Sequence, residues 1–201
     1  IEGDINDTIF DPIRGSDDEI ESRGLIWSDP NNDSLIICRL NNCLLSENNG
    51  RSWNSIDGLT KPIAIYKFAT THPKLLFAGT QSGLMHSKDG GRRWRKSTLK
   101  GISIHDMTTD GSLIYAATNN GLYLSQDGIL WNRITKTGFA SFDMNTVYAD
   151  DEIPGSVWAA TNDEFFRSDD YAQSFANLSS NTPNSVFELK PLWRTNQLAA
   201  L

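Results

Sequence analysis

The side chains best suited to chemistry in this 201-residue chain are mostly neutral amides that stand in short turns between apolar runs. Amide and hydroxyl groups can hydrogen-bond a glycan or a peptide. Turn geometry selects the same residue types, so ligand binding and turn formation are alternative roles at each position. The candidate ligand-binding residues are Arg39, Asn41, Asn119, Asn120, Asn162 and Asp163.

Catalytic and metal-binding patterns are missing from the sequence. His72, His86 and His105 do not have the spacing of metal ligands. There is no nucleophile elbow or phosphate loop. Acidic residues are plentiful, but none can be paired by spacing into the two carboxylates of a glycosidase. We therefore predict no cofactor, no metal site and no catalytic residues.

One cationic stretch stands out in a chain whose net charge is −7. It could bind an acidic partner. It could also be a solvated outer strand whose positive charge prevents pairing with other sheet edges, which is the interpretation we favour. The residues are Arg92, Arg93, Arg95, Lys96 and Lys100.

Four copies of one segment separate these candidate residues. The pattern is Ser-x-Asp/Asn-x-Gly-x-x-Trp, and its aromatic residues recur at intervals of 41, 37 and 44 residues. The third copy is one residue shorter, and the fourth has Ala for Gly and Phe for Trp. The pattern residues are Ser46, Asn48, Gly50 and Trp53; Ser87, Asp89, Gly91 and Trp94; Ser125, Asp127, Gly128 and Trp131; and Ser168, Asp170, Ala172 and Phe175.

A period of this length is typical of solenoids, propellers and other repeat arrays. Asp or Asn followed by Gly, with an apolar run before it and an aromatic after it, predicts a β-hairpin turn. We expect the Asp or Asn side chain to accept backbone N–H groups of the turn and the Gly to adopt a positive φ. The aromatic is expected to be buried between neighbouring sheets.

The repeat resembles the Asp-box, or bacterial neuraminidase repeat, of sialidases, sortilin-type receptors, xyloglucanases and photosystem II assembly propellers. The four copies cover roughly residues 20–180. The resemblance implies an all-β propeller in which the Ser, Asp/Asn, Gly and aromatic residues of the box are structural. It implies no particular activity, because the same box occurs in proteins of unrelated function.

Each repeat reads as four short strands joined by tight turns, which is one propeller blade. No stretch has sustained helical periodicity; a β-solenoid is the structural alternative.

The chain is predicted to be one domain or a fragment of one. Thr8-Ile9-Phe10 could complete the fifth blade and close the ring, or the chain could be a segment of a larger propeller. The expected divisions are an acidic segment 1–24, blades at about 25–58, 59–98, 99–138 and 139–182, and the start of a fifth at 183–201.

Cys38 and Cys43 flank a short turn, and two interpretations stay open. Pairing of the flanking strands could bring them close enough for a disulfide. The repeat favours the other interpretation, because Cys38 takes the place of Gly79 and Cys43 takes the place of Leu84 in the second unit. Both are core positions that a free cysteine fills well.

The net negative charge of the chain disfavours nonspecific binding to nucleic acid or to anionic lipid. No apolar run approaches the length of a membrane span.

The segment Pro12-Ile13-Arg14 is not the Arg-Ile-Pro motif of sialidases, and the chain is too short for their six blades. We predict a non-enzymatic binding or assembly module that presents a rigid face to a protein or a glycan. The alternative is a sialidase-like or xyloglucanase-like glycoside hydrolase, or a fragment of one.

Localisation follows from the resemblance alone. Repeats of this kind are common in secreted and envelope proteins, so the resemblance implies an extracellular, periplasmic or other envelope or lumenal compartment.

Overall fold

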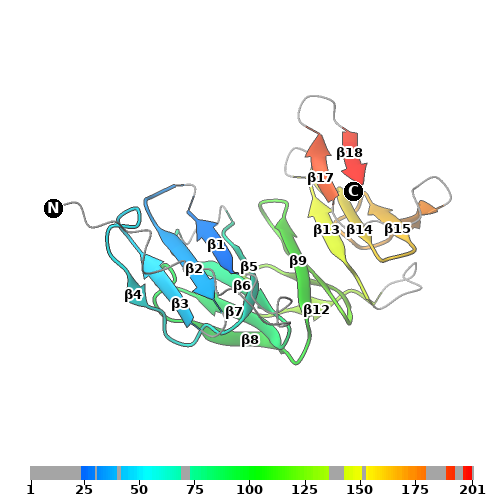
Figure 1. The fold of residues 1–201 in the computed structure, drawn as a ribbon. Helices are drawn as coiled ribbons and strands as arrows, with labels where there is room; N and C mark the ends of the chain where they lie inside the picture. Colours follow the sequence, from blue (N-terminus) through cyan, green and yellow to red (C-terminus); the bar gives the residue numbers. More distant parts are fainter. Residues whose placement is uncertain are drawn as a thin grey trace, which may run out of the picture.

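The structure is a computed structural model, and it describes residues 24–29, 31–39, 42–68, 73–135, 143–150, 153–179, 189–192 and 197–200. These residues form four antiparallel sheets of four strands each and one sheet of two strands (Figure 1). The predicted all-β fold of four-stranded antiparallel blades is confirmed. The strand Thr8-Ile9-Phe10, expected to close the ring, lies outside the described residues.

We name the sheets blades 1 to 5 in chain order. Blade 1 contains β1 (Leu25–Ser28), β2 (Leu35–Arg39), β3 (Asn42–Ser46) and β4 (Asn54–Ser55). Blade 2 contains β5 (Pro62–Tyr66), β6 (Leu76–Thr80), β7 (Gly83–Ser87) and β8 (Arg95–Lys100). Blade 3 contains β9 (Ile104–Thr109), β10 (Ile114–Thr118), β11 (Gly121–Ser125) and β12 (Asn132–Arg133). Blade 4 contains β13 (Thr146–Ala149), β14 (Val157–Ala160), β15 (Phe165–Ser168) and β16 (Ala176–Asn177). The two strands of blade 5 are β17 (Leu189–Leu192) and β18 (Gln197–Ala200).

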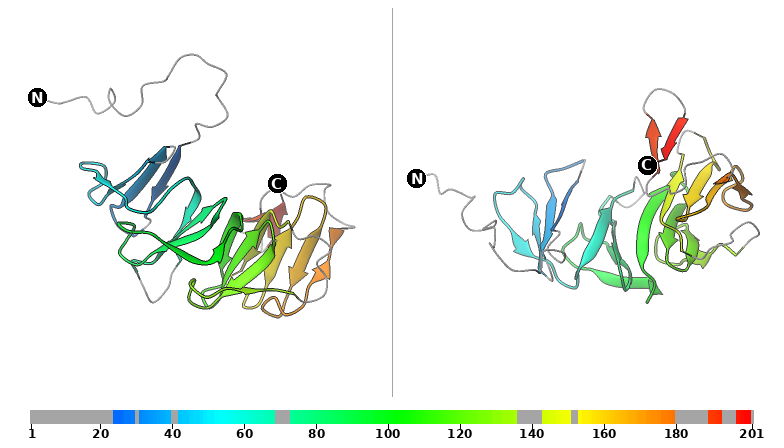
Figure 2. Two further views of the ribbon diagram at one scale, coloured as in Figure 1. Left: turned by 90° about the horizontal axis from the view of Figure 1, so that it is seen from below. Right: turned by 45° about the vertical axis from the view of Figure 1, so that its right-hand side comes forward.

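The blades are arranged side by side along an arc (Figure 2). Within each complete blade the strands pair in chain order, as short turns between successive strands require. The first strand of each blade contacts the first strand of the next, so β1, β5, β9, β13 and β17 line the inner side of the arc. This is the arrangement of a β-propeller.

The hydrophobic core is divided into layers between neighbouring blades. The layer between blades 1 and 2 includes Ile36, Leu45 and Trp94, and the layer between blades 2 and 3 includes Phe77 and Ile104. Because each sheet has apolar residues on both faces, a blade buries its surface only when it stacks against its neighbours. The stack therefore depends on the close fit of one blade against the next.

The second strands carry small residues where the next blade approaches most closely. A Cβ added at Gly79 would lie 3.1 Å from the Cβ of Ile104, on the inner strand of blade 3. Ala116 and Ala117 stand at the corresponding place in β10 and are fully buried. Small side chains at these positions let successive blades pack tightly.

Cys38 and Cys43 form a disulfide between β2 and β3, with Cα atoms 4.1 Å apart. The favoured expectation of two free cysteines is therefore wrong. Both residues do occupy buried core positions, but they lie directly opposite each other across the two strands, which places their sulfur atoms within bonding reach. The equivalent cross-strand pair in blade 3 is Ala117 with Leu122.

A buried ion pair joins blades 1 and 2. The Lys67 ammonium contacts the Asp29 carboxylate, and the two side chains are only 8% and 6% exposed. Burial tends to raise the pKa of Asp29, but hydrogen bonds from Lys67, Asn31 and Asn32 and the charge of Lys67 outweigh it and lower that pKa. The turn after β1 is thus held against the end of β5 by a charged contact.

Candidate functional site

The blades present two kinds of turn at opposite ends. The turns between third and fourth strands contain the repeated segments, and we call this the box end. The turns between second and third strands, together with the starts of the first strands, lie at the other end, which we call the hairpin end. In β9 and β10, for example, Ile104 at the start of one strand pairs with Thr118 at the end of the other.

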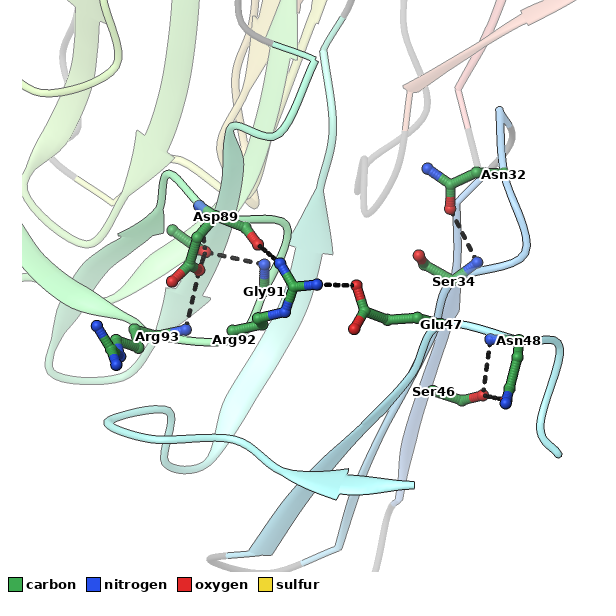
Figure 3. A network of polar contacts seen from close by, with 10 residues as sticks. Asn32, Ser34, Ser46, Glu47, Asn48, Asp89, Gly91, Arg92 and Arg93 are labelled. Atoms are coloured by element: carbon green, nitrogen blue, oxygen red, sulfur yellow. Dashed lines mark hydrogen bonds and ion pairs between the residues drawn. The ribbon is translucent and has the colours of Figure 1, made fainter. Parts of the chain in front are cut away.

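The box turns share one hydrogen-bond pattern; Figure 3 shows it in the second copy, with the Ser46–Asn48 contact of the first copy beside it. In the second copy the Ser87 hydroxyl donates to Asp89 Oδ1 at 2.8 Å and accepts the Gly91 amide at 2.9 Å. Asp89 Oδ1 also accepts the Arg93 amide at 3.0 Å. The corresponding Ser hydroxyl accepts a turn amide at 2.8 Å in the first and third copies and at 3.0 Å in the fourth.

These bonds explain why the box carboxylates have low pKa values. Backbone amides, led by that of Leu130, lower the pKa of Asp127. The hydroxyl and the amide of Ser174 lower the pKa of Asp170 to about 2. For Asp89 partial burial works in the opposite direction, but bonds from the Arg93 amide and the Ser87 hydroxyl outweigh it. Because the carboxylates serve their own turns, we propose that the box residues are structural.

The glycine position of each box has a positive φ, with values of 83° at Gly50, 97° at Gly91 and 70° at Gly128. Ala172 adopts the same conformation in the fourth box, with φ at 61°. A left-handed backbone is what the turn requires, and glycine adopts it most easily.

Three of the four box aromatics lie between blades. The indole N–H of Trp94 donates to the Gly91 carbonyl at 2.9 Å, and that of Trp131 donates to the Gly128 carbonyl at 3.0 Å. Trp94 is buried, Trp131 and Phe175 pack at the edges of the next two layers, and Trp53 in blade 1 is half-buried. In blades 2, 3 and 4 the aromatic thus joins the box to the layer that its blade shares with the preceding one, and only Trp94 is buried as fully as expected.

The hairpin end uses a second repeated residue that the sequence analysis did not detect. The Thr80 hydroxyl donates to the Gly83 carbonyl at 2.6 Å, and the Thr118 hydroxyl donates to the Gly121 carbonyl at 2.7 Å. In blade 4 the Thr161 hydroxyl accepts the amides of Asp163 and Glu164. The signal was a threonine directly after the small residues of the second strand in blades 2, 3 and 4; blade 1 has Arg39 there. Its hydroxyl closes the turn that carries the candidate ligand-binding residues.

The candidate ligand-binding residues are exposed at the hairpin end wherever the structure describes them. Arg39 ends β2 in blade 1, and Asn41 lies outside the described residues. Asn119 Oδ1 accepts the Ser103 amide at 2.9 Å, and Asn120 Nδ2 donates to the Tyr123 hydroxyl at 3.0 Å.

Asn145, directly before the first strand of blade 4, contributes to the same group of residues. Asn162 Oδ1 accepts a hydrogen bond from Asn145 Nδ2 at 2.7 Å, and Asp163 follows in the same turn. The structure therefore gathers the polar residues of blades 3 and 4, whereas Arg39 stands two blades away along the arc.

His105 and Asp143 belong to this end and were missed as candidates. His105 Nδ1 lies 2.9 Å from the Met144 carbonyl oxygen and 3.5 Å from Asp143 Oδ1. Neighbouring Asp106 Oδ2 accepts the Thr146 hydroxyl at 2.7 Å, so the inner strands of blades 3 and 4 are tied together here. No spacing rule connects residues so far apart, so only the folded chain reveals the pair.

The cationic stretch is divided by the fold. Arg92 Nη2 forms an ion pair with Glu47 of the neighbouring box at 2.7 Å, visible in Figure 3. Arg93 is exposed at the box end beside it. Arg95, Lys96 and Lys100 follow along β8, the outermost strand of blade 2.

Within the part of the chain that the structure describes, no three His, Cys, Asp or Glu residues gather where they could hold a metal ion. The described segments also contain no helix with the length and apolar character needed to cross a membrane.

No protein-family model matches this chain, and no curated protein matches it in sequence. Solved structures do match its fold. The chain is 17% identical to a GH74 xyloglucanase from Xanthomonas campestris, with a TM-score of 0.58, covering 82% of this chain and 33% of that one. It is 14% identical to the extracellular domain of BT4673 from B. thetaiotaomicron, with a TM-score of 0.61, covering 83% and 24% of the two chains.

A third similar structure is YCF48 bound to the D1 peptide, at 14% identity and a TM-score of 0.56, covering 81% of this chain and 55% of that one. The chain therefore spans between about a quarter and about half of the length of these three proteins. At such low identity the shared feature is the fold, and the chain is a β-propeller of the kind seen in these neighbours.

Proposed function

We propose that this propeller is a non-enzymatic binding or assembly module whose hairpin end binds a protein or a glycan. The observation that carries the proposal is the set of exposed amides at the hairpin end of blades 3 and 4. Asn119, Asn120 and Asn162 are each oriented by a hydrogen bond within the protein. Oriented amides on a rigid scaffold lose little conformational freedom when a ligand binds.

Two further observations support parts of the proposal. The similar propeller YCF48 was solved with a bound peptide, which favours a protein partner for a fold of this shape. The Cys38–Cys43 disulfide and the extracellular neighbour favour an extracellular, periplasmic or lumenal compartment, because disulfides persist where the surroundings are oxidising.

A glycoside hydrolase, sialidase-like or xyloglucanase-like, or a piece of one, is the second candidate. It is favoured by the similarity to a GH74 xyloglucanase, of which this chain spans only a third. This support is an analogy of fold.

The two candidates are separated by testing retention and turnover on the same protein. Wild type is applied to a glycan array and a peptide library, and in parallel to a panel of fluorogenic glycosides. We expect the protein to be retained on the array or the library and to hydrolyse none of the glycosides. Turnover of any glycoside would favour the hydrolase and contradict the binding module.

A pair of variants locates the binding surface. Asn162→Ala with Asp163→Ala removes an amide and a carboxylate from the hairpin end. Gln126→Ala with Asp33→Ala removes the same groups from exposed positions at the box end. The first variant is expected to lose at least half of the retained ligand, and the second to bind like wild type. Equal binding by both would place the ligand elsewhere.

A further inference from the structure

Blade 2 has an outer strand unlike those of the other complete blades. Strand β8 has six residues, whereas β4, β12 and β16 have two each. It stands last in the strand order of its sheet, so along one side no described strand pairs with it. An edge of this length presents a row of backbone N–H and C=O groups that can hydrogen-bond another extended chain. The middle of β8 is held in place by the Thr98 hydroxyl, which donates to the Ile129 carbonyl at 3.1 Å.

The edge is strongly cationic. Arg95, Lys96 and Lys100 are exposed, while Ser97 and Leu99 are buried. Among the described residues neither lysine has an acidic partner; the ion pairs of this region use Arg92 instead. These cations oppose pairing with a basic edge, including that of a second copy of the chain. They attract an acidic strand for the same electrostatic reason.

A small pocket of about 90 Å³ lies beside the two lysines. Its lining includes Gly58, Thr60, Ser82, Gly83, Lys96 and Lys100. The walls are closely packed backbone, because a Cβ at Gly58 would lie 2.6 Å from the Trp94 carbonyl oxygen and one at Gly83 would lie 2.4 Å from that of Leu99. A pocket with such walls is preformed, and its size suits a single carboxylate group.

The loop that carries Gly58 is also fixed by the backbone. The Asp57 amide donates to the Arg92 carbonyl at 3.2 Å, and the Asp57 carbonyl accepts the Trp94 amide at 3.0 Å. The loop is thus fixed against blade 2, and the fold sets the position of the pocket wall at Gly58.

We infer that β8 is a docking edge for an extended acidic peptide of a partner protein. The peptide adds to blade 2 as a fifth strand and places two carboxylates, four residues apart, against Lys96 and Lys100, with one of them at the pocket. Backbone bonds along β8 provide affinity, and the spacing of the acidic side chains provides specificity. This surface reaches the hairpin turn of blade 2 at Ser82 and Gly83. It does not include the exposed amides of blades 3 and 4, so the inference does not depend on the proposed function.

The probe is a fluorescein-labelled peptide, Thr-Val-Glu-Thr-Val-Thr-Glu-Val-Thr, whose binding is followed by fluorescence anisotropy. Saturable binding that weakens with added salt is expected. Lys96→Thr with Lys100→Thr should weaken it about tenfold. The matched control, Arg51→Thr with Lys74→Thr, removes two positive charges from exposed positions elsewhere and should bind like wild type. Thermal unfolding verifies that both variants are folded.

Two further probes separate strand addition from plain attraction between charges. A version of the peptide with alternate backbone amides N-methylated keeps every carboxylate but cannot pair along an edge, so its binding should be lost. Polygalacturonate carries a high density of carboxylates without a peptide backbone and should bind more weakly than the peptide. Equal loss in the control variant, undiminished binding of the methylated peptide, equal binding of the polysaccharide or no binding of the first peptide would each overturn the inference.

Discussion

At the scale of single residues, the glycine of the box turn does more than allow a tight turn. A Cβ at Gly91 would lie 3.0 Å from the Ile36 side chain, and one at Gly128 would lie 2.1 Å from that of Phe77. Ile36 and Phe77 are in the second strands of the preceding blades. The glycine therefore meets two demands at once, a positive φ and room for a neighbouring side chain.

Substitution of Gly128 separates these two demands. Gly90 has a φ of 77°, close to the 70° of Gly128, but a Cβ added at Gly90 would meet no other atom within 4 Å. Gly90→Ala should cost about 1 kcal/mol of unfolding free energy, from the backbone conformation alone. Gly128→Ala should cost about 3 kcal/mol or more, because Phe77 must also move. Urea unfolding of the two variants measures the difference; equal costs would show that the close approach has no energetic weight.

At the scale of elements, the hairpin of each second and third strand is closed by a cross-strand pair of core residues. The pair is Gly79 with Leu84 in blade 2 and Ala117 with Leu122 in blade 3. In blade 1 the same register positions hold the Cys38–Cys43 disulfide. One position in the repeat is thus filled either by a small and a large apolar residue or by a covalent bond.

This equivalence predicts that the disulfide can be replaced without loss of the fold. Closing so short a loop should stabilise the oxidised protein by about 2 kcal/mol. Addition of dithiothreitol should therefore lower the unfolding free energy of wild type by about that amount. Cys38→Ala with Cys43→Leu copies the blade 3 pair, should fold, and should not respond to the reductant. A variant that fails to fold, or a wild type indifferent to reduction, would contradict the equivalence.

At the scale of the whole molecule, stability depends on the layers between blades, and one layer contains a titratable group. His86 lies opposite Phe77 across β6 and β7 and is 8% exposed. Its Nδ1 atom is buried and has no hydrogen-bond partner among the described residues. Burial is the main cause that lowers the pKa of His86, and the charges of Lys88 and Arg95 lower it further. The folded protein therefore favours neutral His86.

The stability of the molecule should fall in mild acid for this reason. Below pH about 6.5 the unfolded chain binds a proton at His86 that the folded chain resists, so the unfolding free energy decreases as the pH falls toward 5. Leucine occupies the corresponding position at Leu45 in blade 1 and Leu124 in blade 3. His86→Leu should remove this part of the pH dependence. Thermal unfolding between pH 5 and 8 tests it, and parallel profiles for wild type and variant would exclude His86 as the cause.

Some features of the molecule follow from the sequence alone, because they depend on residues only a few positions apart. The box hydrogen bonds join residues two to four positions apart, such as Ser87 with Gly91, and the same residue types recur in each copy. The repeat therefore predicted the all-β fold of four-stranded antiparallel blades.

The contacts between blades were decided only by the tertiary structure. Arg92 and Glu47 are 45 residues apart, Lys67 and Asp29 are 38 apart, and His105 lies 39 residues from Met144. Such pairs depend on how one sheet stacks against the next, which no local pattern encodes. The same reason explains why the demand of Phe77 on Gly128 became visible only once the blades were packed side by side. The pairing of the two cysteines is local, but the sequence left it open, and the register of β2 against β3 decided it.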